Sequence, residues 1–318
     1  MSLFVQKPGL LTTIQDHGRH RYQFLGFSVN GPMDSFSMET ANFLLQNDTN
    51  AAVIEMGMVG GSFLFQKNTV IAITGAFMNP KVNQQAIKQG APIPVRSGDL
   101  LTFGLANNGV FTYLAVKNGF ISPPFLKSRS FIHVDGQSSF PGPKIEKGDC
   151  IPYDECSSSA PKQWFVNTMD LEIEPTIRFQ EGSQYDWFTD QAKETFEHDR
   201  YFVTAQSNRM GYRLNGTPLQ RKVNHEMWTE ATLFGSIQVP PNGQPVILMA
   251  DRQPTGGYPK IGQVIQADLP KMSQLNVSSS ITFKKVTIAE AMEKLTELEH
   301  KKRLIKRFID QKWKELHL

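Results

Sequence analysis

Short apolar runs, separated by glycine, proline and polar turn residues, constrain this sequence more than any other feature. The chain has 24 glycines and 19 prolines in 318 residues. Short runs of this kind between turn signals are typical of β-strands. The sequence therefore predicts a mainly β protein, with strands at residues 3–6, 62–65, 70–74, 100–103, 111–116, 177–179, 201–204, 236–239, 245–250 and 281–283.

Few segments have helical spacing. One spans roughly residues 35–46 with Asp34 as its N-cap, and a short one follows Thr189. A long C-terminal helix, about residues 288–316, opens with a Thr-Ile-Ala-Glu capping box and carries lysines along one face. A basic amphipathic helix can bind a membrane or a partner, but it more commonly packs on its own domain.

The chain is long enough for one large domain or two smaller ones. Glu55 and Gly60 precede one apolar strand, and Glu230 and Gly235 precede another at the same spacing, which suggests a duplicated β unit or a coincidence. A proline- and serine-rich stretch at residues 141–162 is the natural junction. We expect two similar halves and a separate amphipathic helix, at residues 1–160, 161–286 and 287–318.

Composition and missing motifs exclude several classes of protein. The net charge of +3 gives no reason to expect nucleic acid or a membrane surface as a partner. Cys150 and Cys156 match no common zinc motif, and we expect two thiols in a reducing cytoplasm. There is no long apolar signal core, and no apolar run reaches the roughly 18 residues of a membrane span. Without a P-loop, a Gly-x-Ser-x-Gly or a His-Glu-x-x-His motif, we expect no intrinsic cofactor and no metal.

The strongest candidate site is the loop at residues 251–260, which directly follows the apolar strand at 245–250. Its paired glycines permit positive φ and close approach of the backbone to a ligand. Its Asp251, Tyr258 and Lys260 could transfer protons or orient a substrate. The alternative interpretation is a surface turn.

Other polar clusters offer binding groups. Gln15 and Arg19 could bind an amide or a carboxylate, because Arg presents a fixed fork of donors; Arg19 could instead pair with a neighbouring aspartate to pin a loop. Arg209 and Arg213 could hold an anionic group, or could be surface arginines paired with nearby acids. Gln238 lies between apolar residues, and a buried amide must find partners in the protein or in a ligand.

Long motifs in these clusters recur in one known family. Its Pro-Gly-x-x-Thr-x-x-Gln-Asp-x-Gly-Arg pattern matches residues 8–19 at every fixed position. Its Arg-Met-Gly-Tyr-Arg-Leu, Gly-x-Ile-Gln-Val-Pro and Asp-Arg-Gln-x-Thr-Gly-Gly-Tyr-Pro-Lys match residues 209–214, 235–240 and 251–260. On these motifs the chain, up to about residue 283, resembles the carboxyltransferase-like family that includes allophanate hydrolase subunit 2, KipA and the C-type subunit of the bacterial ATP-dependent 5-oxoprolinase.

Departures from the family pattern gather in the middle of the chain. Asn118 stands where the family has the first glycine of a Gly-Gly pair, and Lys127 replaces the glycine of Gly-Ser-Arg-Ser-Thr. A glycine-rich segment is altered at residues 136–142, and Asn208 replaces the aspartate of Ser-Asp-Arg-Met. The resemblance is therefore stronger in the C-terminal half.

The resemblance implies a cyclophilin-like β-barrel architecture and work within a complex. The partners it implies are a KipI-type chain, which is the B-type subunit of the 5-oxoprolinase, and a LamB/YcsF-type chain, which is its A-type subunit. The complex would use ATP to open the lactam of 5-oxoproline to L-glutamate, and this chain alone would be inactive. The implied catalytic residues are Asp251, Tyr258 and Lys260; the implied substrate-binding residues are Gln15, Arg19, Arg209, Arg213, Gln238, Gln253 and Thr255.

Two other functions fit the same resemblance. A KipA-like regulator would bind and antagonise a KipI-type inhibitor of a sensor kinase, and would need the interface without the polar site. A carboxyltransferase subunit would take a carboxyl group from carboxybiotin, and the biotin would be carried on another chain, because this sequence has no Met-Lys-Met attachment motif.

Overall fold

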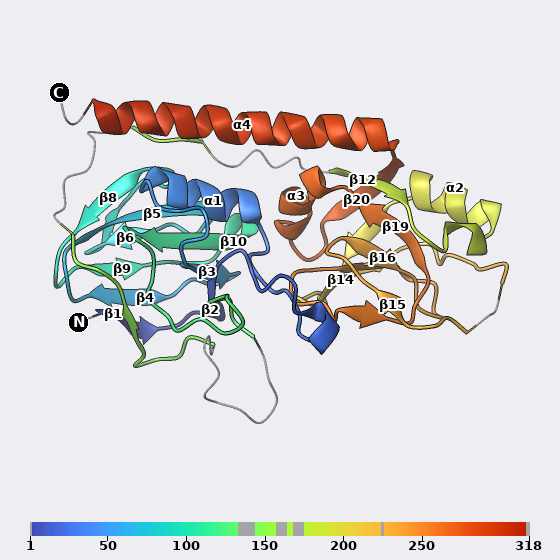
Figure 1. Ribbon diagram of the computed structural model, residues 1–318, viewed down its shortest axis with the longest axis horizontal. Helices are drawn as coiled ribbons and strands as arrows, with labels where there is room; N and C mark the ends of the chain where they lie inside the picture. The colour runs from blue at the N-terminus through green and yellow to red at the C-terminus, as the bar shows by residue number, and fades with distance from the viewer. Residues whose placement is uncertain (1, 133–143, 157–163, 168–174, 224–225, 316–318) are drawn as a thin grey trace. The chain divides into compact units, whose positions relative to one another are not determined.

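The computed structural model describes residues 2–132, 144–156, 164–167, 175–223 and 226–315, and it is mainly β (Figure 1). The helices are α1 (Ser35–Leu44), α2 (Asp190–His198), α3 (Leu269–Ser273) and α4 (Ile288–Lys314), with single 3-10 turns at Gln23–Leu25, Tyr185–Trp187 and Gln266–Asp268. The strands are β1 (Ser2–Lys7), β2 (Leu11–Gln15), β3 (Val53–Gly57), β4 (Ser62–Phe65), β5 (Thr69–Phe77), β6 (Lys81–Val82), β7 (Gln85–Ala86), β8 (Pro92–Val95), β9 (Leu100–Thr102), β10 (Asn107–Val116), β11 (Cys150–Pro152), β12 (Thr176–Glu181), β13 (Tyr201–Val203), β14 (Gly211–Asn215), β15 (Glu230–Ala231), β16 (Ser236–Gln238), β17 (Val246–Leu248), β18 (Thr255–Gly256), β19 (Lys260–Val264) and β20 (Ser280–Lys285). Each predicted strand coincides with one of these, so the mainly β class is confirmed.

The chain forms two compact units. The first comprises Met1–Arg19, Asn30–Asp170 and His300–Leu318, and the second comprises His20–Val29 and Leu171–Glu299. Helix α4 therefore contributes its first part to the second unit and the rest to the first unit. The predicted boundary at residue 160 and both ends of the predicted junction lie outside the described residues, and strand β11 lies in the part of the junction that is described. The division into three parts stays a prediction.

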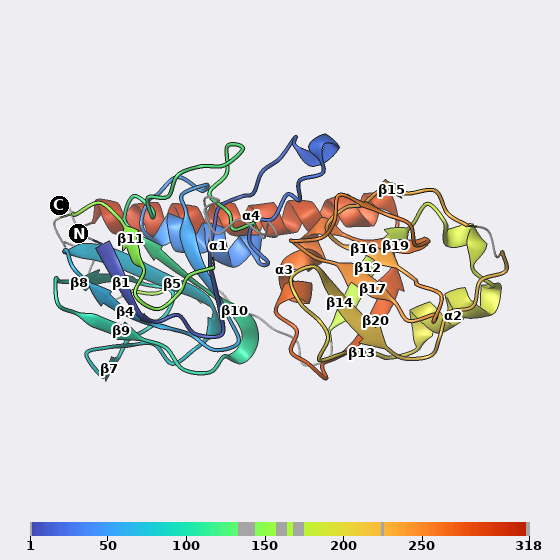
Figure 2. The same ribbon diagram turned by 90° about the horizontal axis from the view of Figure 1, so that it is seen from below.

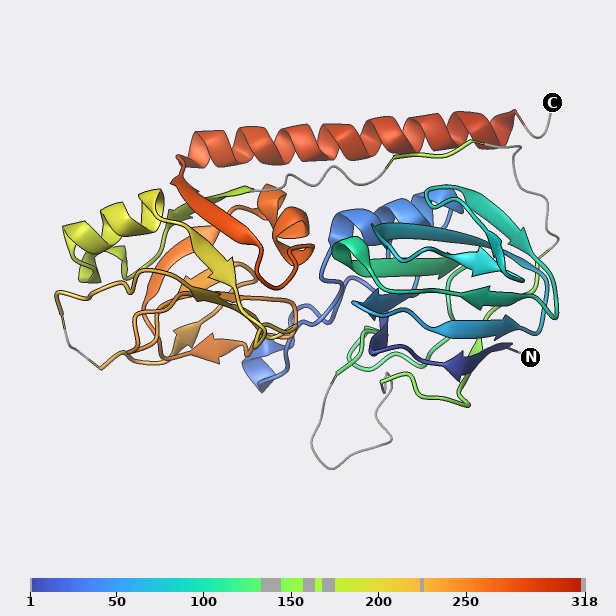
Figure 3. The same cartoon turned by 180° about the vertical axis from the view of Figure 1, so that it is seen from behind.

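Two sheets enclose the core of the first unit (Figure 3). Their strand orders are β11-β1-β4-β9-β6-β7 and β2-β3-β10-β5-β8. Alternate residues of β4, Phe63 and Phe65, are buried in the same core as Ile54 of β3 and Leu114 of β10. Because strands of both sheets supply one core, the sheets pack face to face.

The predicted helix starts are confirmed by their caps. Asp34 accepts a hydrogen bond from a backbone N–H in the first turn of α1, and Thr189 does the same for α2. At the start of α4, Thr287 and Glu290 exchange backbone and side-chain hydrogen bonds of 2.7 and 3.2 Å, which is the predicted capping box. The predicted end of this helix at residue 316 lies outside the described residues.

Helix α4 packs on the first unit through its C-terminal part. Nε1 of Trp313 donates to the carbonyl of Leu44 at 3.0 Å, and Lys302 lies 3.0 Å from Glu39. Ile309 is fully buried, which confirms that this part of the helix packs on its own chain. None of the described helices, α4 included, is both long and apolar enough to cross a membrane.

The second unit is a closed barrel (Figure 2). Its strand order is β12-β19-β16-β17-β14-β13-β20, and the parallel pair β12–β20 closes it. Phe179, Phe196 of α2, Tyr201 and Phe283 fill one part of its core, with the rings of Phe196 and Phe283 stacked 4.2 Å apart. The barrel and the long C-terminal helix confirm these two parts of the predicted fold class.

The duplicated β unit that the sequence suggests would make two pairs of strands equivalent, but these strands do not have equivalent neighbours in the structure. In the first unit the corresponding strands, β4 and β5, belong to different sheets. In the second unit β16 and β17 are hydrogen-bonded neighbours in the barrel. Similar local spacing of Glu, Gly and an apolar strand therefore coexists with different pairing in the two units.

Candidate functional site

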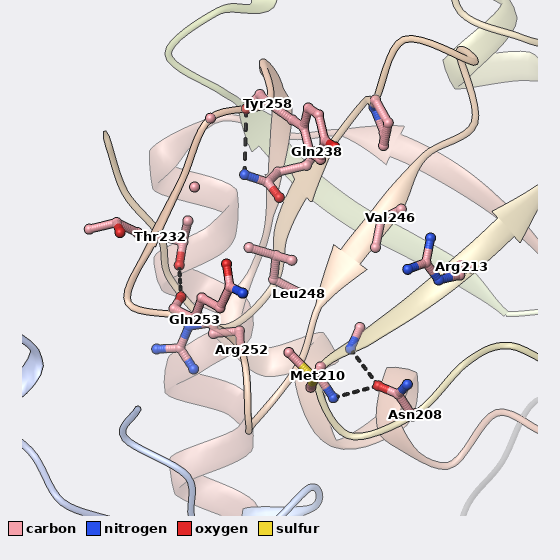
Figure 4. A pocket seen from close by; sticks show the side chains of 15 residues that line it. Asn208, Met210, Arg213, Thr232, Gln238, Val246, Leu248, Arg252, Gln253 and Tyr258 are labelled. Atoms are coloured by element: carbon pink, nitrogen blue, oxygen red, sulfur yellow. Dashed lines mark hydrogen bonds between the residues drawn. The ribbon is translucent and has the colours of Figure 1, made fainter. Parts of the chain in front are cut away.

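A pocket of about 250 Å³ in the second unit gathers much of the predicted site (Figure 4). Strands β14, β16, β17 and β18 and their loops line it, with Val246 and Leu248 supplying apolar wall. The predicted residues that line it are Arg213, Gln238, Gln253, Thr255 and Tyr258. The loop at residues 251–260 therefore forms part of a concave site.

Hydrogen bonds hold this loop in place. Thr232 donates to the loop twice, from Oγ1 to the Gln253 carbonyl at 2.5 Å and from its backbone N–H to the Pro254 carbonyl at 2.9 Å. Oγ of Ser28 donates to the carbonyl of Arg252 at 2.7 Å. Strand β18, inside the loop, also pairs with β15. The backbone of the loop is thus fixed at several points, as a pre-formed binding site requires.

The paired glycines of the loop are explained by packing. Neither Gly256 nor Gly257 has positive φ, so that part of the sequence interpretation is wrong. A Cβ added to Gly256 would lie 2.5 Å from Nε2 of Gln238 and 3.2 Å from Cγ2 of Thr232. A Cβ on Gly257 would meet no atom closer than 3.9 Å. Gly256 is needed so that the loop can lie close to the Gln238 amide, whereas Gly257 has room for a side chain.

Asp251 and Arg209 form a bidentate ion pair at the start of the loop. Nε and Nη2 of Arg209 lie 2.7 and 2.9 Å from the two carboxylate oxygens of Asp251. The side chains are only 5% and 15% exposed, so water screens this pair weakly. The backbone N–H of Asp251 also donates to the Arg209 carbonyl at 2.8 Å. These two predicted residues lie outside the pocket lining and join the β14 end to the loop.

Lys260 lies at the other end of the loop, outside the pocket lining. Its Nζ is 2.9 Å from Oε2 of Glu230 and donates to the carbonyl of Ala231 at 3.1 Å. Hydrogen bonds from Lys260 and then from Gln184 lower the pKa of Glu230, which stays ionised. The Lys260 side chain therefore connects β19 to strand β15, the partner of the loop strand.

Gln238 and Tyr258 present polar groups to the pocket. Gln238 is buried, as the sequence predicted, and its Nε2 donates to the carbonyl of Tyr258 at 3.5 Å. The Tyr258 side chain is 48% exposed and so accessible to a ligand. Asn208 keeps the turn beside the pocket, because its Oδ1 accepts from the backbone N–H of Met210 at 2.8 Å. An aspartate would accept in the same way, so this departure from the family pattern preserves the local structure.

The remaining predicted site residues belong to the first unit. Gln15 is fully buried at the end of β2, and its Nε2 donates to Oγ1 of Thr13 at 3.0 Å. Arg19 is buried and donates to the side-chain oxygen of Asn30 and to the backbone carbonyl of Ser130. The other predicted site residues all lie in the second unit.

Asp16, beside these residues, is the centre of a buried hydrogen-bond network. Its carboxylate accepts from Oγ of Ser128 at 2.5 Å, Oγ of Ser130 at 2.7 Å, the N–H of Arg129 at 2.6 Å and the N–H of Gly18 at 2.9 Å. Burial alone would raise the pKa of Asp16, but these hydrogen bonds outweigh it and lower the pKa below its ordinary value. The network ties the first polar motif to residues 128–130.

Sequence reasoning did not assign Thr232 or Arg252 to the site, although both line the pocket. Thr232 carries no motif signal, and only strand pairing brings it to the loop. Arg252 stands inside the most specific motif, yet nothing in the sequence indicates that its side chain is 8% exposed and lines the pocket. An arginine next to an aspartate in sequence suggests a local ion pair, whereas here the aspartate pairs with Arg209.

The pocket combines an apolar wall with positive charge. Among the described residues, its lining includes Arg213 and Arg252 and no Asp or Glu. Within the described part of the chain, no group of three or more His, Cys, Asp or Glu side chains is arranged to hold a metal ion. Guanidinium and amide donors on an apolar wall suit a small ligand that carries oxyanion or amide groups.

Comparisons with known proteins point to one family. The model of the carboxyltransferase domain, subdomain A and B, matches residues 25–285. The chain is 33% identical to the C-type subunit of 5-oxoprolinase from Escherichia coli strain K12 over 291 residues, which cover 92% of this chain and 93% of that protein. It is also 33% identical to the protein of the same name from Haemophilus influenzae over 300 residues, covering 94% of this chain and 96% of that protein.

A solved structure shares the fold. The crystal structure of the K. lactis urea amidolyase superposes with a TM-score of 0.87 at 26% identity, over 96% of this chain. The match spans only 20% of the urea amidolyase chain. Similarity therefore extends along nearly all of the present chain, and it corresponds to one part of that larger enzyme.

Proposed function

Because this chain belongs to the family of carboxyltransferase domains with subdomains A and B, we propose that it is the C-type subunit of an ATP-dependent 5-oxoprolinase, which opens the lactam of 5-oxoproline to L-glutamate. The observation that carries the proposal is the 33% identity to two 5-oxoprolinase proteins of this type, over more than nine-tenths of both partners in each alignment. A protein of this type is one of several subunits. In the proposal the others are a KipI-type and a LamB/YcsF-type chain, and the complex uses the ATP.

The pocket suits this chemistry. Opening a lactam places negative charge on the carbonyl oxygen, and fixed donors around that oxygen stabilise it. The carboxamides of Gln238 and Gln253 and the hydroxyls of Thr255 and Tyr258 supply such donors within one pocket. The apolar wall formed by Val246 and its neighbours matches the ring methylenes of a lactam.

The predicted catalytic residues divide into two groups in this proposal. Tyr258 lines the pocket and meets the ligand directly, so it can donate a proton to the departing lactam nitrogen. Asp251 and Lys260 act as positioning residues through their pairs with Arg209 and Glu230, which fix the two ends of the loop. Gln15 and Arg19, in the first unit, remain predicted binding residues.

Reconstitution with the two partner chains tests the proposal. We expect the chain alone to be inert and the complex to release L-glutamate from 5-oxoproline only when ATP is present. Asp251→Ala and Lys260→Ala should lower turnover at least tenfold, because each frees one end of the loop. Asp186→Ala, at a side chain 95% exposed in the same unit, is the control and should leave turnover unchanged. Full activity of the Asp251 and Lys260 variants would show that the site assignment is wrong.

The similarity to urea amidolyase favours one second candidate, transfer of a carboxyl group to an amide. That reaction would need biotin on a partner chain, whereas lactam hydrolysis would not. Adding avidin to the reconstituted complex separates the two reactions. We expect no effect of avidin on glutamate release; loss of activity with avidin would favour carboxyl transfer.

A further inference from the structure

Arg252 carries a buried positive charge with few partners in the protein. Its side chain is 8% exposed, and its hydrogen bond from Nη1 to the Met249 carbonyl is 3.4 Å long, near the limit for such a bond. Among the described residues, Nε of Arg252 meets no acceptor. A guanidinium has five N–H donors, and burying it without acceptors is costly. The side chain therefore lacks the oxygen atoms that its burial requires.

The nearest acidic side chain does not supply them. Both carboxylate oxygens of Asp251 already accept from Arg209, at 2.7 and 2.9 Å. As far as the structure describes the chain, the pocket that Arg252 lines has no Asp or Glu in its lining. Burial lowers the pKa of Arg252 to about 10, with Asp251 offsetting only part of the effect, so the side chain is still charged at neutral pH. Among the described residues, no carboxylate forms an ion pair with this guanidinium, so an anion from outside the chain can pair with it.

The ring of Phe234 borders the Arg252 side chain. The guanidinium carbon lies 5.9 Å from the centre of that ring, within the range of a cation–π contact. This contact gives Nε no oxygen acceptor, so Nε still lacks a hydrogen-bond partner among the described residues. In Figure 4, Arg252 lies beside Thr232 and Gln253, and Arg213 lies on the opposite side of the view. An oxyanion at Arg252 would leave the Gln253 amide for a second group of the same ligand.

We propose that Arg252 binds the carboxylate of a small amide-bearing acid, and that it makes this pocket select carboxylate ligands over neutral ones. The planar guanidinium suits a carboxylate because two parallel N–H···O bonds can form. The class of ligand is thus a cyclic or linear amide with one carboxylate. Using 5-oxoproline as the probe rests on the proposed function; the carboxylate site itself does not.

Matched ligands test the proposal on the full chain and on the three-chain complex. 5-Oxoproline is compared with 5-oxoprolinamide, in which a neutral carboxamide replaces the carboxylate, by titration calorimetry. We expect the carboxylate ligand to bind at least tenfold more tightly to the wild-type protein in one or both preparations, as charge-assisted hydrogen bonds in a partly dry site allow. Equal affinity of the two ligands in both preparations overturns the proposal, and so does absence of binding by either ligand.

Variants assign the preference to Arg252. In Arg252→Gln the tenfold preference should disappear, and Arg252→Lys should keep only part of it, because Lys cannot form the paired bonds. Arg200→Gln, at an exposed arginine of the same unit outside the pocket lining, is the control and should keep the full preference. If Arg252→Gln keeps the preference, or Arg200→Gln removes it, Arg252 is not the carboxylate site. A circular dichroism spectrum checks that each variant is folded.

This experiment is independent of the catalytic one. Selective binding of the carboxylate ligand with no glutamate release from the complex would refute the proposed function and keep the Arg252 site. Glutamate release by a complex that binds the two ligands with equal affinity would refute the Arg252 site and keep the proposed function. The two proposals can therefore fail separately.

Discussion

Gly256 is the position where one added carbon tests the pocket most directly. A Cβ there would lie 2.5 Å from Nε2 of Gln238, about 1 Å inside ordinary contact, whereas a Cβ on Gly257 would have free space to 3.9 Å. The end of the Gln238 side chain is flexible and can rotate away. Doing so breaks its 3.5 Å hydrogen bond to the Tyr258 carbonyl. We therefore expect Gly256→Ala to displace the Gln238 amide while the barrel stays folded.

The magnitude follows from three contributions. Losing this long hydrogen bond costs about 0.5 kcal/mol, and a displaced rotamer costs about 0.5–1.5 kcal/mol. Replacing Gly by Ala restores about 0.4–1 kcal/mol through the unfolded chain. The free energy of unfolding should thus fall by about 1 kcal/mol in Gly256→Ala and rise by up to about 1 kcal/mol in Gly257→Ala. Because Gln238 is a predicted substrate ligand, loss of its amide contact should raise KM about fivefold to tenfold.

Thermal unfolding and the KM for 5-oxoproline of the reconstituted complex measure the two effects. A double variant identifies the cause: in a Gln238→Ala background, Gly256→Ala should add almost nothing to KM, because the group it displaces is gone. The reasoning is refuted if Gly256→Ala raises KM by the same factor in that background. It is refuted equally if Gly257→Ala raises KM as much as Gly256→Ala does.

Two further predictions concern the first unit. Leu126 and Lys127 have φ of 49° and 63° in a tight turn, so Lys127→Gly should raise the free energy of unfolding by about 1 kcal/mol, and Lys127→Ala should not, as chemical denaturation would show. Asp16→Asn should lower the free energy of unfolding by about 3 kcal/mol at neutral pH. The NH2 group of the new amide would face hydrogen-bond donors that now bind the carboxylate. Since the folded pKa of Asp16 is lowered, its contribution is present above the unfolded value near 4 and is lost as pH falls through the folded pKa. Unfolding curves from pH 7 to pH 3 should therefore show that the difference in free energy of unfolding between wild type and Asp16→Asn shrinks below about pH 4. A pH-independent difference would contradict the prediction for Asp16. No gain in stability for Lys127→Gly would contradict the prediction for the turn.

Local pattern is sufficient to predict the strands whose side chains alternate or are uniformly apolar. Phe63 and Phe65 of β4 alternate with less buried neighbours, and this period of two is visible in the sequence. Strands β14 and β19 escape such a prediction, because glycine and charged residues interrupt them, as Arg213 and Lys260 show. Their strand state comes from barrel closure, in which neighbours far apart in sequence supply the hydrogen bonds.

The family motifs include residues that line the pocket, but they could not indicate which side chains share it. Arg19 and Arg209 are both motif arginines with the same donor fork. Arg19 donates a hydrogen bond to the Ser130 carbonyl in the first unit, whereas Arg209 pairs with Asp251 in the second. Burial separates them from Arg252, and burial depends on tertiary structure. Lys127 makes the same point for divergence: a lysine replaces a glycine, and the turn keeps positive φ.

The buried charge of Arg252 is the feature of the pocket that stability alone does not explain. A barrel that needed only to fold could place an apolar residue between Phe234 and the pocket, because an uncompensated guanidinium in a dry site destabilises the protein. Arg209 shows how this chain satisfies a buried arginine, since its guanidinium donates to both carboxylate oxygens of Asp251. Arg252 has a long bond to the Met249 carbonyl instead. Residues that break a local rule without compensation inside the protein concentrate at functional sites, where a ligand supplies what is missing. The contrast between these two arginines is therefore an argument for a carboxylate ligand that does not depend on the name of any relative.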